Sequence, residues 1–278
     1  MKLLTLNTHS LVEGKSAEQV EILCEAILCE GFDVIALQEV NQPIKNPPAE
    51  GQLWGHCPIP CQEIRMSVKE GNFSLALAQS LTMAGAPGYW CYLPMKVGYG
   101  KYDEGLSLFC RTPIVELRYG YLTERSAYDD WKTRMALGVR CEGRDAWFWS
   151  LHTGWWEDAE EPFREQWRRL LSLLPRDSDV WLMGDFNQPA ERCGEGAALM
   201  RKDGFYDAYE LAERTAGDGT ASGMIDGWRG RGASDGLLRL DQIRTNRKQK
   251  ISSCRTLFDG ERYAVISDHF GVAVTVED

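Results

Sequence analysis

Residues 180–187 read Val-Trp-Leu-Met-Gly-Asp-Phe-Asn, a short apolar run followed directly by a polar turn. An apolar run of this length is typical of a strand that is covered on both faces. Asp185 and Asn187 then stand just beyond the carboxyl end of the strand, and layered α/β folds gather their ligand-binding groups at that edge. The stretch therefore predicts a buried sheet with a polar crevice along one edge.

Other segments repeat this arrangement of a strand followed by polar residues. The first strand is expected over Lys2 to Asn7, and the apolar run that ends at Leu37 stops before Gln38 and Glu39. Apolar residues cluster or alternate again in five later segments, where further strands are expected: 106–110, 135–139, 146–151, 238–243 and 272–276.

Helical spacing separates several of these strands. Ser16 is expected to cap a helix, with Gln19 completing a capping box and Gly31 ending the helix. Apolar residues recur at helical spacing near 74–85 and 162–174. Helices alternate with strands and strand pairs, which predicts an α/β protein built as a four-layer α/β/β/α sandwich of two mixed sheets with helices outside.

The composition indicates one globular domain over residues 1–278. With 44% apolar and 26% charged residues, the chain is neither disordered nor a coiled coil. No apolar run reaches the roughly 18 residues that a membrane-spanning helix needs. Met1 and Lys2 lead directly into a strand rather than a secretory signal, so we expect a cytoplasmic protein.

The charge balance weakens any interpretation as a general nucleic-acid-binding protein. A formal net charge of −10 repels polyanions at long range. The densest basic run, residues 244–250, is typical of a solvated turn. Two long polar loops, 41–72 and 215–236, could cover a crevice and exclude a duplex.

Residues with catalytic chemistry gather at the predicted strand ends. Taken singly, each has an ordinary structural explanation as a strand terminus, an Asx turn or a hydrogen-bonded histidine. Taken together they could face one cavity, and the set comprises Asn7, Glu39, His152, Asp185, Asn187, Asp241, Asp268 and His269.

In this order, the segments that carry these residues resemble the endonuclease/exonuclease/phosphatase superfamily. The matching segments are Leu-Thr-Leu-Asn at 4–7, Ala-Leu-Gln-Glu-Val at 36–40, Ser-Leu-His-Thr at 150–153, Gly-Asp-Phe-Asn at 184–187, Arg-Leu-Asp-Gln-Ile at 239–243 and Ser-Asp-His at 267–269. The resemblance implies the fold of that superfamily and the metal-dependent hydrolysis of a phosphate ester.

The resemblance also implies a role for each residue. Glu39, with Asn7 and Asp268, would hold Mg²⁺ or Mn²⁺, because both ions prefer oxygen ligands. Asp185 would orient and deprotonate the attacking water. The phosphoryl oxygens would be bound by Asn187, by His152 and by a protonated His269 whose partner is Asp241. An ionised Asp185 beside a protonated His269 predicts a bell-shaped pH profile for the reaction.

Within the superfamily, the chain most resembles the bacterial maltose 6′-phosphate phosphatases. The start of the chain and residues 103–107, 133–138, 152–156 and 225–228 carry this resemblance. It implies a substrate that is a phosphorylated disaccharide. Aromatic faces suit pyranose rings and a guanidinium suits a phosphate, so candidate substrate contacts are Trp155, Trp156, Trp228, Trp54 and Arg134. Each of these could instead be a core tryptophan or an exposed strand-end arginine.

Two alternatives remain open. One is a phosphodiesterase of the same superfamily, either a DNA or RNA nuclease or a phospholipid hydrolase resembling the sphingomyelinases. The other is a binding module that retains the fold without the activity, which is disfavoured because every motif position is present. His9 and His56 lie near the motifs, and we assign neither a role.

Overall fold

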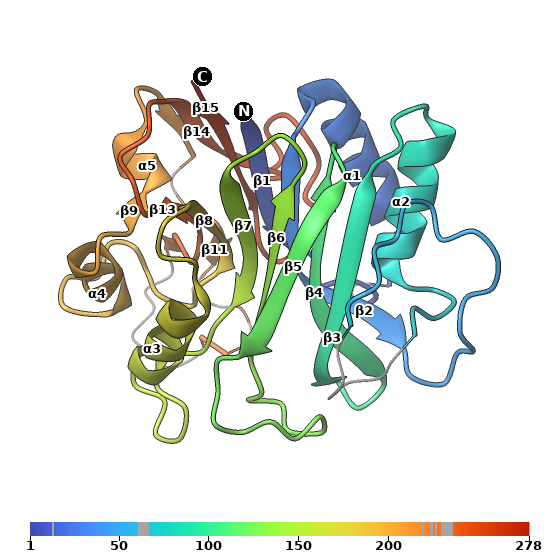
Figure 1. Cartoon of the computed structure of the whole chain (residues 1–278), viewed down its shortest axis with the longest axis horizontal. Helices are drawn as coiled ribbons and strands as arrows, with labels where there is room; N and C mark the ends of the chain where they lie inside the picture. The colour runs from blue at the N-terminus through green and yellow to red at the C-terminus, as the bar shows by residue number, and fades with distance from the viewer. Residues whose placement is uncertain are drawn as a thin grey trace.

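Two β-sheets pack face to face at the centre of the computed structural model of the chain (Figure 1). The structure describes residues 1–12, 14–60, 67–217, 219–222, 225, 227–228 and 236–277. Within these residues, the seven-stranded sheet has the order β10 (Thr215–Ala216), β14 (Ile251–Leu257), β15 (Gly271–Val276), β1 (Lys2–Asn7), β2 (Val34–Pro43), β4 (Tyr102–Cys110) and β3 (Tyr89–Gly98). The six-stranded sheet has the order β5 (Ile114–Tyr121), β6 (Met135–Cys141), β7 (Ala146–His152), β8 (Asp179–Asp185), β13 (Asp241–Thr245) and β9 (Tyr206–Asp207). A separate pair joins β11 (Ala221–Ser222) to β12 (Leu237–Leu238).

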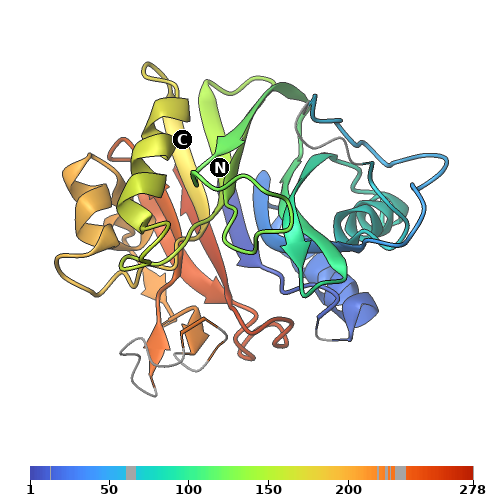
Figure 2. The same cartoon turned by 90° about the horizontal axis from the view of Figure 1, so that it is seen from below.

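Helices cover the outer face of each sheet (Figure 2). α1 (Ser16–Glu30) and α2 (Phe73–Met83) pack on the seven-stranded sheet, where Leu23 and Leu77 share a buried cluster with Leu37. α3 (Phe163–Leu173) packs on the six-stranded sheet, where Trp167 joins Leu182. Of the two shorter helices, α4 (Gly196–Lys202) packs beside α3, whereas α5 (Ala208–Leu211) contacts β13 and β14 and packs against the core between the sheets.

The space between the sheets is a continuous apolar core. Leu3 and Leu108 of one sheet share a buried cluster with Phe148 and Met183 of the other, and each is at most 1% exposed. Truncating a leucine at such a position costs about 2–5 kcal/mol. The expected four-layer α/β/β/α arrangement of two mixed sheets is confirmed.

The start of α1 differs from the sequence-based expectation, whereas its end agrees. Lys15 precedes the helix without a capping hydrogen bond from its side chain, and Ser16 is the first helical residue. Gln19 therefore completes no capping box. Its Nε2 donates to the carbonyl of Thr8 at 3.3 Å and to that of Ile266 at 2.5 Å, which ties the helix to two loops at the end of β1. Gly31 ends the helix in the left-handed conformation, as expected.

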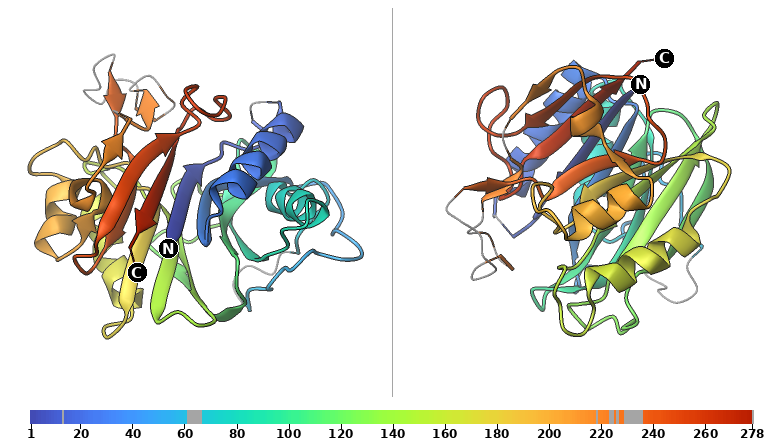
Figure 3. Two further views of the ribbon diagram at one scale, coloured as in Figure 1. Left: turned by 90° about the horizontal axis from the view of Figure 1, so that it is seen from above. Right: turned by 90° about the vertical axis from the view of Figure 1, so that its left-hand side faces the viewer.

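Parallel pairing in each sheet brings the carboxyl ends of neighbouring strands to one edge. β1 runs parallel to β2, with Asn7 opposite Gln38, and β7 runs parallel to β8, with His152 opposite Asp185. β13 runs antiparallel to β8 and begins at the same edge with Asp241. The two termini lie side by side at the opposite end of β1, as Figure 3 shows.

None of the helices in the described part of the chain has both the length and the apolar character that crossing a bilayer requires.

Candidate active site

Polar side chains join the two sheets at the edge where the strands end. Gln38 donates from Nε2 to Ser150 Oγ at 3.0 Å, and Ser150 donates to the carbonyl of Leu37 at 3.0 Å. Asn7 Nδ2 donates to Asp185 Oδ2 at 3.3 Å. These bonds connect β1 and β2 of one sheet to β7 and β8 of the other, so residues from both sheets meet in one place.

Local backbone distortions aim the site residues into the crevice. The pairing of β2 with β4 shifts register between Leu37 and Val40, and Glu39 lies within this bulge with φ of 48°. Asn187 also has φ of 48°. Left-handed conformations of non-glycine residues concentrate at functional sites, and bulges redirect single side chains.

Gly184 allows β8 to approach β7 closely. A Cβ at this position would lie 1.9 Å from the carbonyl oxygen of Leu151, and the residue has φ of 155°. Only glycine fits, which explains the glycine before Asp185 in the segment from which the fold was predicted.

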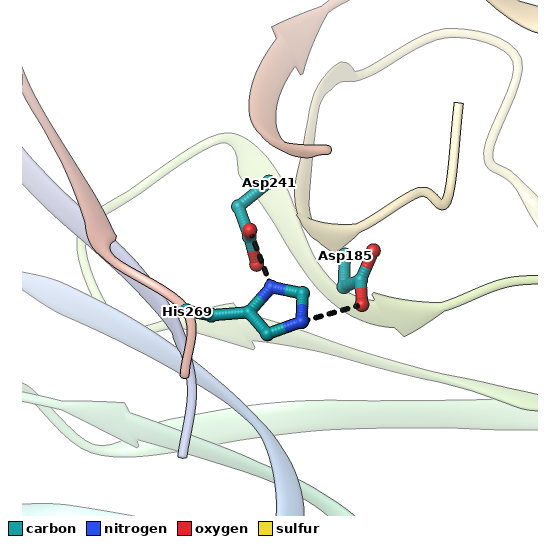
Figure 4. Close-up of side chains that lie close together, drawn as sticks. All are labelled: Asp185, Asp241 and His269. Atoms are coloured by element: carbon teal, nitrogen blue, oxygen red, sulfur yellow. Dashed lines mark hydrogen bonds and ion pairs between the residues drawn. The ribbon is translucent and has the colours of Figure 1, made fainter. Parts of the chain in front are cut away.

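Asp241, His269 and Asp185 form a hydrogen-bonded and ion-paired group at the centre of the site (Figure 4). His269 Nδ1 lies 2.8 Å from Asp241 Oδ2, and His269 Nε2 lies 3.8 Å from Asp185 Oδ2. Burial alone would lower the pKa of His269, but the carboxylates of Asp241 and Asp185 outweigh it and hold that pKa well above its usual value. The arrangement favours a positively charged imidazolium.

The carboxylate of Asp185 is held in a fixed orientation. Its Oδ1 accepts a hydrogen bond from the backbone N–H of Asn187 at 2.8 Å. Burial raises the pKa of Asp185 to about 7, with His269 acting in the opposite direction. A carboxylate with a pKa near neutrality is suited to accept a proton from water.

The amide of Asn187 has an orientation that its neighbours determine. Trp228 Nε1 donates to Asn187 Oδ1 at 2.8 Å, and Asn187 Nδ2 donates to the carbonyl of Thr153 at 2.9 Å. Because an indole N–H can only donate and a carbonyl can only accept, the two partners fix which end of the amide is oxygen. Among the described residues, no acceptor other than the carbonyl of Thr153 is seen for Asn187 Nδ2, so its second N–H could bind a ligand.

Carboxylates also crowd the part of the cavity around Glu39. Burial, together with the neighbouring carboxylate of Glu104, raises the pKa of Glu39, and Asp268 adds to this effect. Asn7 Nδ2 donates to Glu39 Oε1 at 3.0 Å, while His9 Nδ1 lies 3.4 Å from Asp268 Oδ1. A divalent cation bound here would offset the repulsion between these carboxylates. Carboxylate oxygens are also the ligands that Mg²⁺ prefers.

A second group of residues could also hold a metal ion. Asp185, Asp241 and His269 present ligand atoms within 4.8 Å of one another. However, the carboxylates of Asp241 and Asp185 hold the pKa of His269 well above its usual value, and a protonated imidazole has no lone pair to offer a metal ion. The hydrogen-bonded triad therefore suits proton transfer, and the acidic group around Glu39 fits a cation better.

His152 and Arg134 line the same cavity from the six-stranded sheet side. Burial and the nearby cations of Arg134 and Lys96 lower the pKa of His152 well below its usual value, so the imidazole is neutral at pH 7. His152 Nε2 lies 3.6 Å from Asp185 Oδ2. Arg134 is 3% exposed, and its Nε has no hydrogen-bond partner among the described residues. A buried guanidinium N–H of this kind is ready to bind an anion.

These groups surround a cavity of about 250 Å³ with an aromatic wall. Trp155, Trp131 and Tyr99 line it, and the rings of Trp131 and Trp155 lie 6.1 Å apart. Asn7 and Asp241 do not line the cavity but contact residues that do, Glu39 and His269. A cavity lined by both aromatic and charged side chains suits a small phosphorylated ligand.

Several expected contacts lie elsewhere. Trp156 and Trp228 line a neighbouring cavity of about 360 Å³ rather than the one around Asp185. Trp54 packs against the core between α1, α2 and the seven-stranded sheet and lines neither cavity. The described part of the loop 41–72 also lines neither cavity: residues 41–43 continue β2, and Cys57 and Ile59 pack against the core between the sheets beside β3. His56 packs on the ring of Trp90, away from the site.

Two charged residues of the cavity were missed in the sequence. Lys96 and Glu104 lie opposite each other on β3 and β4, and Lys96 Nζ is 3.1 Å from Glu104 Oε1. Both are buried and both line the cavity. The available signal was the one charged residue of β3, Lys96, and the adjacent Asp103 and Glu104 at the start of β4, since buried charges are uncommon unless they are paired or functional.

Comparisons with known proteins agree with this geometry. A sequence model described as the Endonuclease/Exonuclease/phosphatase family matches residues 4–269. No curated protein matches the chain. Among solved structures, an endonuclease/exonuclease/phosphatase family protein from Leptotrichia buccalis has a TM-score of 0.82 at 28% identity, with 100% of both chains covered.

Two other solved structures share the fold at lower identity. The mannosyl-6-phosphatase of Bacteroides thetaiotaomicron has a TM-score of 0.65 at 18% identity, with 100% of both chains covered. The TDP2 of D. rerio, complexed with a single-strand DNA product, has a TM-score of 0.61 at 16% identity, with 100% of this chain and 99% of that chain covered.

Proposed function

The chain belongs to the endonuclease/exonuclease/phosphatase family, and from this premise we propose that it is a metal-dependent phosphomonoesterase that hydrolyses a sugar phosphate. The proposed substrate is maltose 6′-phosphate or a related phosphorylated disaccharide. Members of the family are phosphoric ester hydrolases, so the proposal concerns which ester is cleaved.

The observation that carries this proposal is the composition of the 250 Å³ cavity. Its lining combines donors for a phosphoryl group, in His269, Asn187 and Arg134, with the indoles of Trp131 and Trp155. Indole faces suit the apolar faces of pyranose rings. A cavity this small suits a monoester of a small molecule better than a duplex, whose backbone needs an extended basic surface.

The proposed metal site uses the acidic group described above. Glu39 and Asp268 would hold Mg²⁺ or Mn²⁺ beside Asn7, and the bound ion would supply positive charge to a phosphoryl oxygen and to the departing alkoxide. Asn7 directs its NH₂ group toward Glu39 and Asp185, and its Oδ1 accepts the backbone N–H of His9 at 3.2 Å. Asn7 thus also orients the carboxylate of Glu39.

The residues of the chain supply the remaining chemistry. Asp185, fixed by the N–H of Asn187, binds the attacking water and accepts its proton as the water oxygen bonds to phosphorus. The bond between phosphorus and the sugar oxygen breaks, the sugar alkoxide takes a proton from solvent, and Asp185 returns its proton to solvent as inorganic phosphate and the sugar leave. Positive charge on His269 and on Arg134 stabilises the phosphoryl oxygens as charge accumulates. The second N–H of Asn187 and a neutral His152 add uncharged donors.

A specific observation favours the alternative of a phosphodiesterase. TDP2, bound to a single-strand DNA product, shares the fold, and stacked aromatic residues can also bind bases. The net charge of −10 opposes this alternative for a polyanionic substrate.

Phosphate release from a panel of sugar phosphates with Mg²⁺, measured beside nicking of a supercoiled plasmid, tests the proposal. We expect turnover of the sugar phosphates and negligible nicking. Rapid nicking without release of phosphate from any sugar phosphate would refute the proposal in favour of a nuclease.

A further inference from the structure

A second cavity of about 360 Å³ adjoins the catalytic cavity and shares two residues of its wall. Trp155 and Asn187 line both cavities. Because Asn187 is placed at the phosphoryl group, a ligand in the second cavity would lie directly beside the phosphorylated part of the substrate. The remaining lining residues are Trp156, Glu157, Arg192, Glu195 and Trp228.

The aromatic content of this cavity resembles that of the first. Three of its seven lining residues are tryptophans. Arg164 lies over the ring of Trp156 at 5.0 Å, and Arg192 lies over the ring of Trp228 at 5.3 Å. Trp228 is only 2% exposed, whereas Trp156 is half-buried, so Trp156 presents the larger indole surface to a ligand.

The charged residues of the cavity exclude a second phosphate. Glu157 and Glu195 supply two carboxylates, whereas Arg192 supplies one guanidinium, which is 3.6 Å from Glu195. A second phosphate would meet more negative than positive charge there, so the next nucleotide of a nucleic acid fits poorly. Carboxylate and guanidinium groups can instead form paired hydrogen bonds with neighbouring hydroxyls.

We propose that this second cavity binds the unphosphorylated ring of a disaccharide whose phosphorylated ring occupies the catalytic cavity. The inference rests on the proposed function and deepens it, because it assigns the residues that would bind the second ring of a phosphorylated disaccharide. The 250 Å³ cavity alone is smaller than the roughly 300–1,000 Å³ typical of small-molecule sites, whereas the two cavities together fall within that range.

The test compares kcat/KM for maltose 6′-phosphate and for glucose 6-phosphate. In the wild type we expect the disaccharide to be preferred by about tenfold or more. Trp156→Ala should lower kcat/KM for the disaccharide by about three- to tenfold and leave the monosaccharide unchanged. If Trp156→Ala folds poorly, Glu195→Gln provides a second variant. Glu195 is half-buried, glutamine keeps its shape, and the substitution should lower kcat/KM for the disaccharide in the same way. Trp54→Ala, which removes an indole outside both cavities, is the matched control.

Equal losses on the two sugar phosphates, or no preference for the disaccharide in the wild type, would overturn the inference while leaving the proposed phosphatase intact. A selective loss of oligonucleotide cleavage in Trp156→Ala would overturn it in favour of a base-stacking site.

Binding measured without turnover separates this inference from the proposed function. Tryptophan fluorescence is titrated with maltose and with glucose. Tighter binding of maltose, lost in Trp156→Ala, supports the second-ring site even if no phosphomonoester is hydrolysed. Equal affinity for the two sugars overturns it.

Discussion

Replacing Trp228 by phenylalanine should slow catalysis through Asn187 alone. Phe keeps an aromatic ring in the cluster with Trp155 and Leu240 but lacks the N–H that binds Asn187 Oδ1 at 2.8 Å. Asn187 is 5% exposed, so its oxygen would lose a buried partner that water replaces poorly. Such a loss costs about 1–3 kcal/mol.

A 180° flip of the Asn187 amide would not restore the lost hydrogen bond. A flip would direct Oδ1 at the carbonyl oxygen of Thr153, which only accepts hydrogen bonds. Without the hydrogen bond from Trp228, the Asn187 side chain should therefore be less well oriented, and so should the N–H that is proposed to bind the phosphoryl group. If that N–H acts mainly in the transition state, kcat falls by about 5- to 150-fold with little change in KM.

A double-mutant cycle provides the assay. Steady-state rates are measured with p-nitrophenyl phosphate, which is too small to reach the second cavity. Asn187→Ala alone should lower kcat by about 10²- to 10³-fold, the usual effect of losing one such donor. Adding Trp228→Phe to Asn187→Ala should cause no further loss, because the indole would have no amide left to orient. Melting temperatures of all four proteins control for unfolding.

Fully multiplicative losses in the double mutant would refute the reasoning. They would mean that Trp228 supports the site by general packing and not by orienting Asn187. An unchanged kcat in Trp228→Phe would refute it equally, because the hydrogen bond would then have no effect on the reaction.

Three further outcomes are expected. Asp185→Asn should lower phosphate release by about 10³-fold or more while circular dichroism stays native; a variant with wild-type rate would show that another group accepts the proton. EDTA should abolish phosphate release and Mg²⁺ or Mn²⁺ should restore it, whereas full activity in EDTA would remove the metal from the mechanism. Asp158 accepts hydrogen bonds from the backbone of Glu160 and Glu161 and from Lys132, and these outweigh its burial and lower its pKa. Its stabilising effect is therefore present above the unfolded pKa of about 4 and disappears as pH falls through the lower folded value. Asp158→Asn should reduce the melting temperature at pH 7 by more than at pH 3, and an equal reduction at both would contradict this assignment.

Much of the fold was predictable because it depends on local patterns. The apolar runs that form β1 and β8 and the glycine that ends α1 each lie within a few consecutive residues, where periodicity and backbone preference act directly. The predicted capping box at the start of α1 was wrong because Gln19 donates to the carbonyls of Thr8 and Ile266. A sequence pattern does not reveal such distant partners.

The candidate site was predictable only in part, for a related reason. The positions that follow strands could be selected because strand ends share an edge. The bulge that turns Glu39 inward depends on register with β4, and the bond from Trp228 to Asn187 joins residues 41 positions apart. Lys96 and Glu104 lie inside strands and face each other only once β3 and β4 are paired. Such features depend on tertiary contacts.

The proposed reacting groups come from both sheets, with Glu39 and His269 attached to one and Asp185 and Asn187 to the other. Turnover therefore depends on how well the two sheets stay aligned. A core substitution far from any substrate, such as Leu108→Ala, can let one sheet slide slightly against the other without unfolding either. The protein would then lose activity on mild heating before it loses secondary structure. Thermal inactivation would then result from a shift of one folded sheet relative to the other, before the chain unfolds.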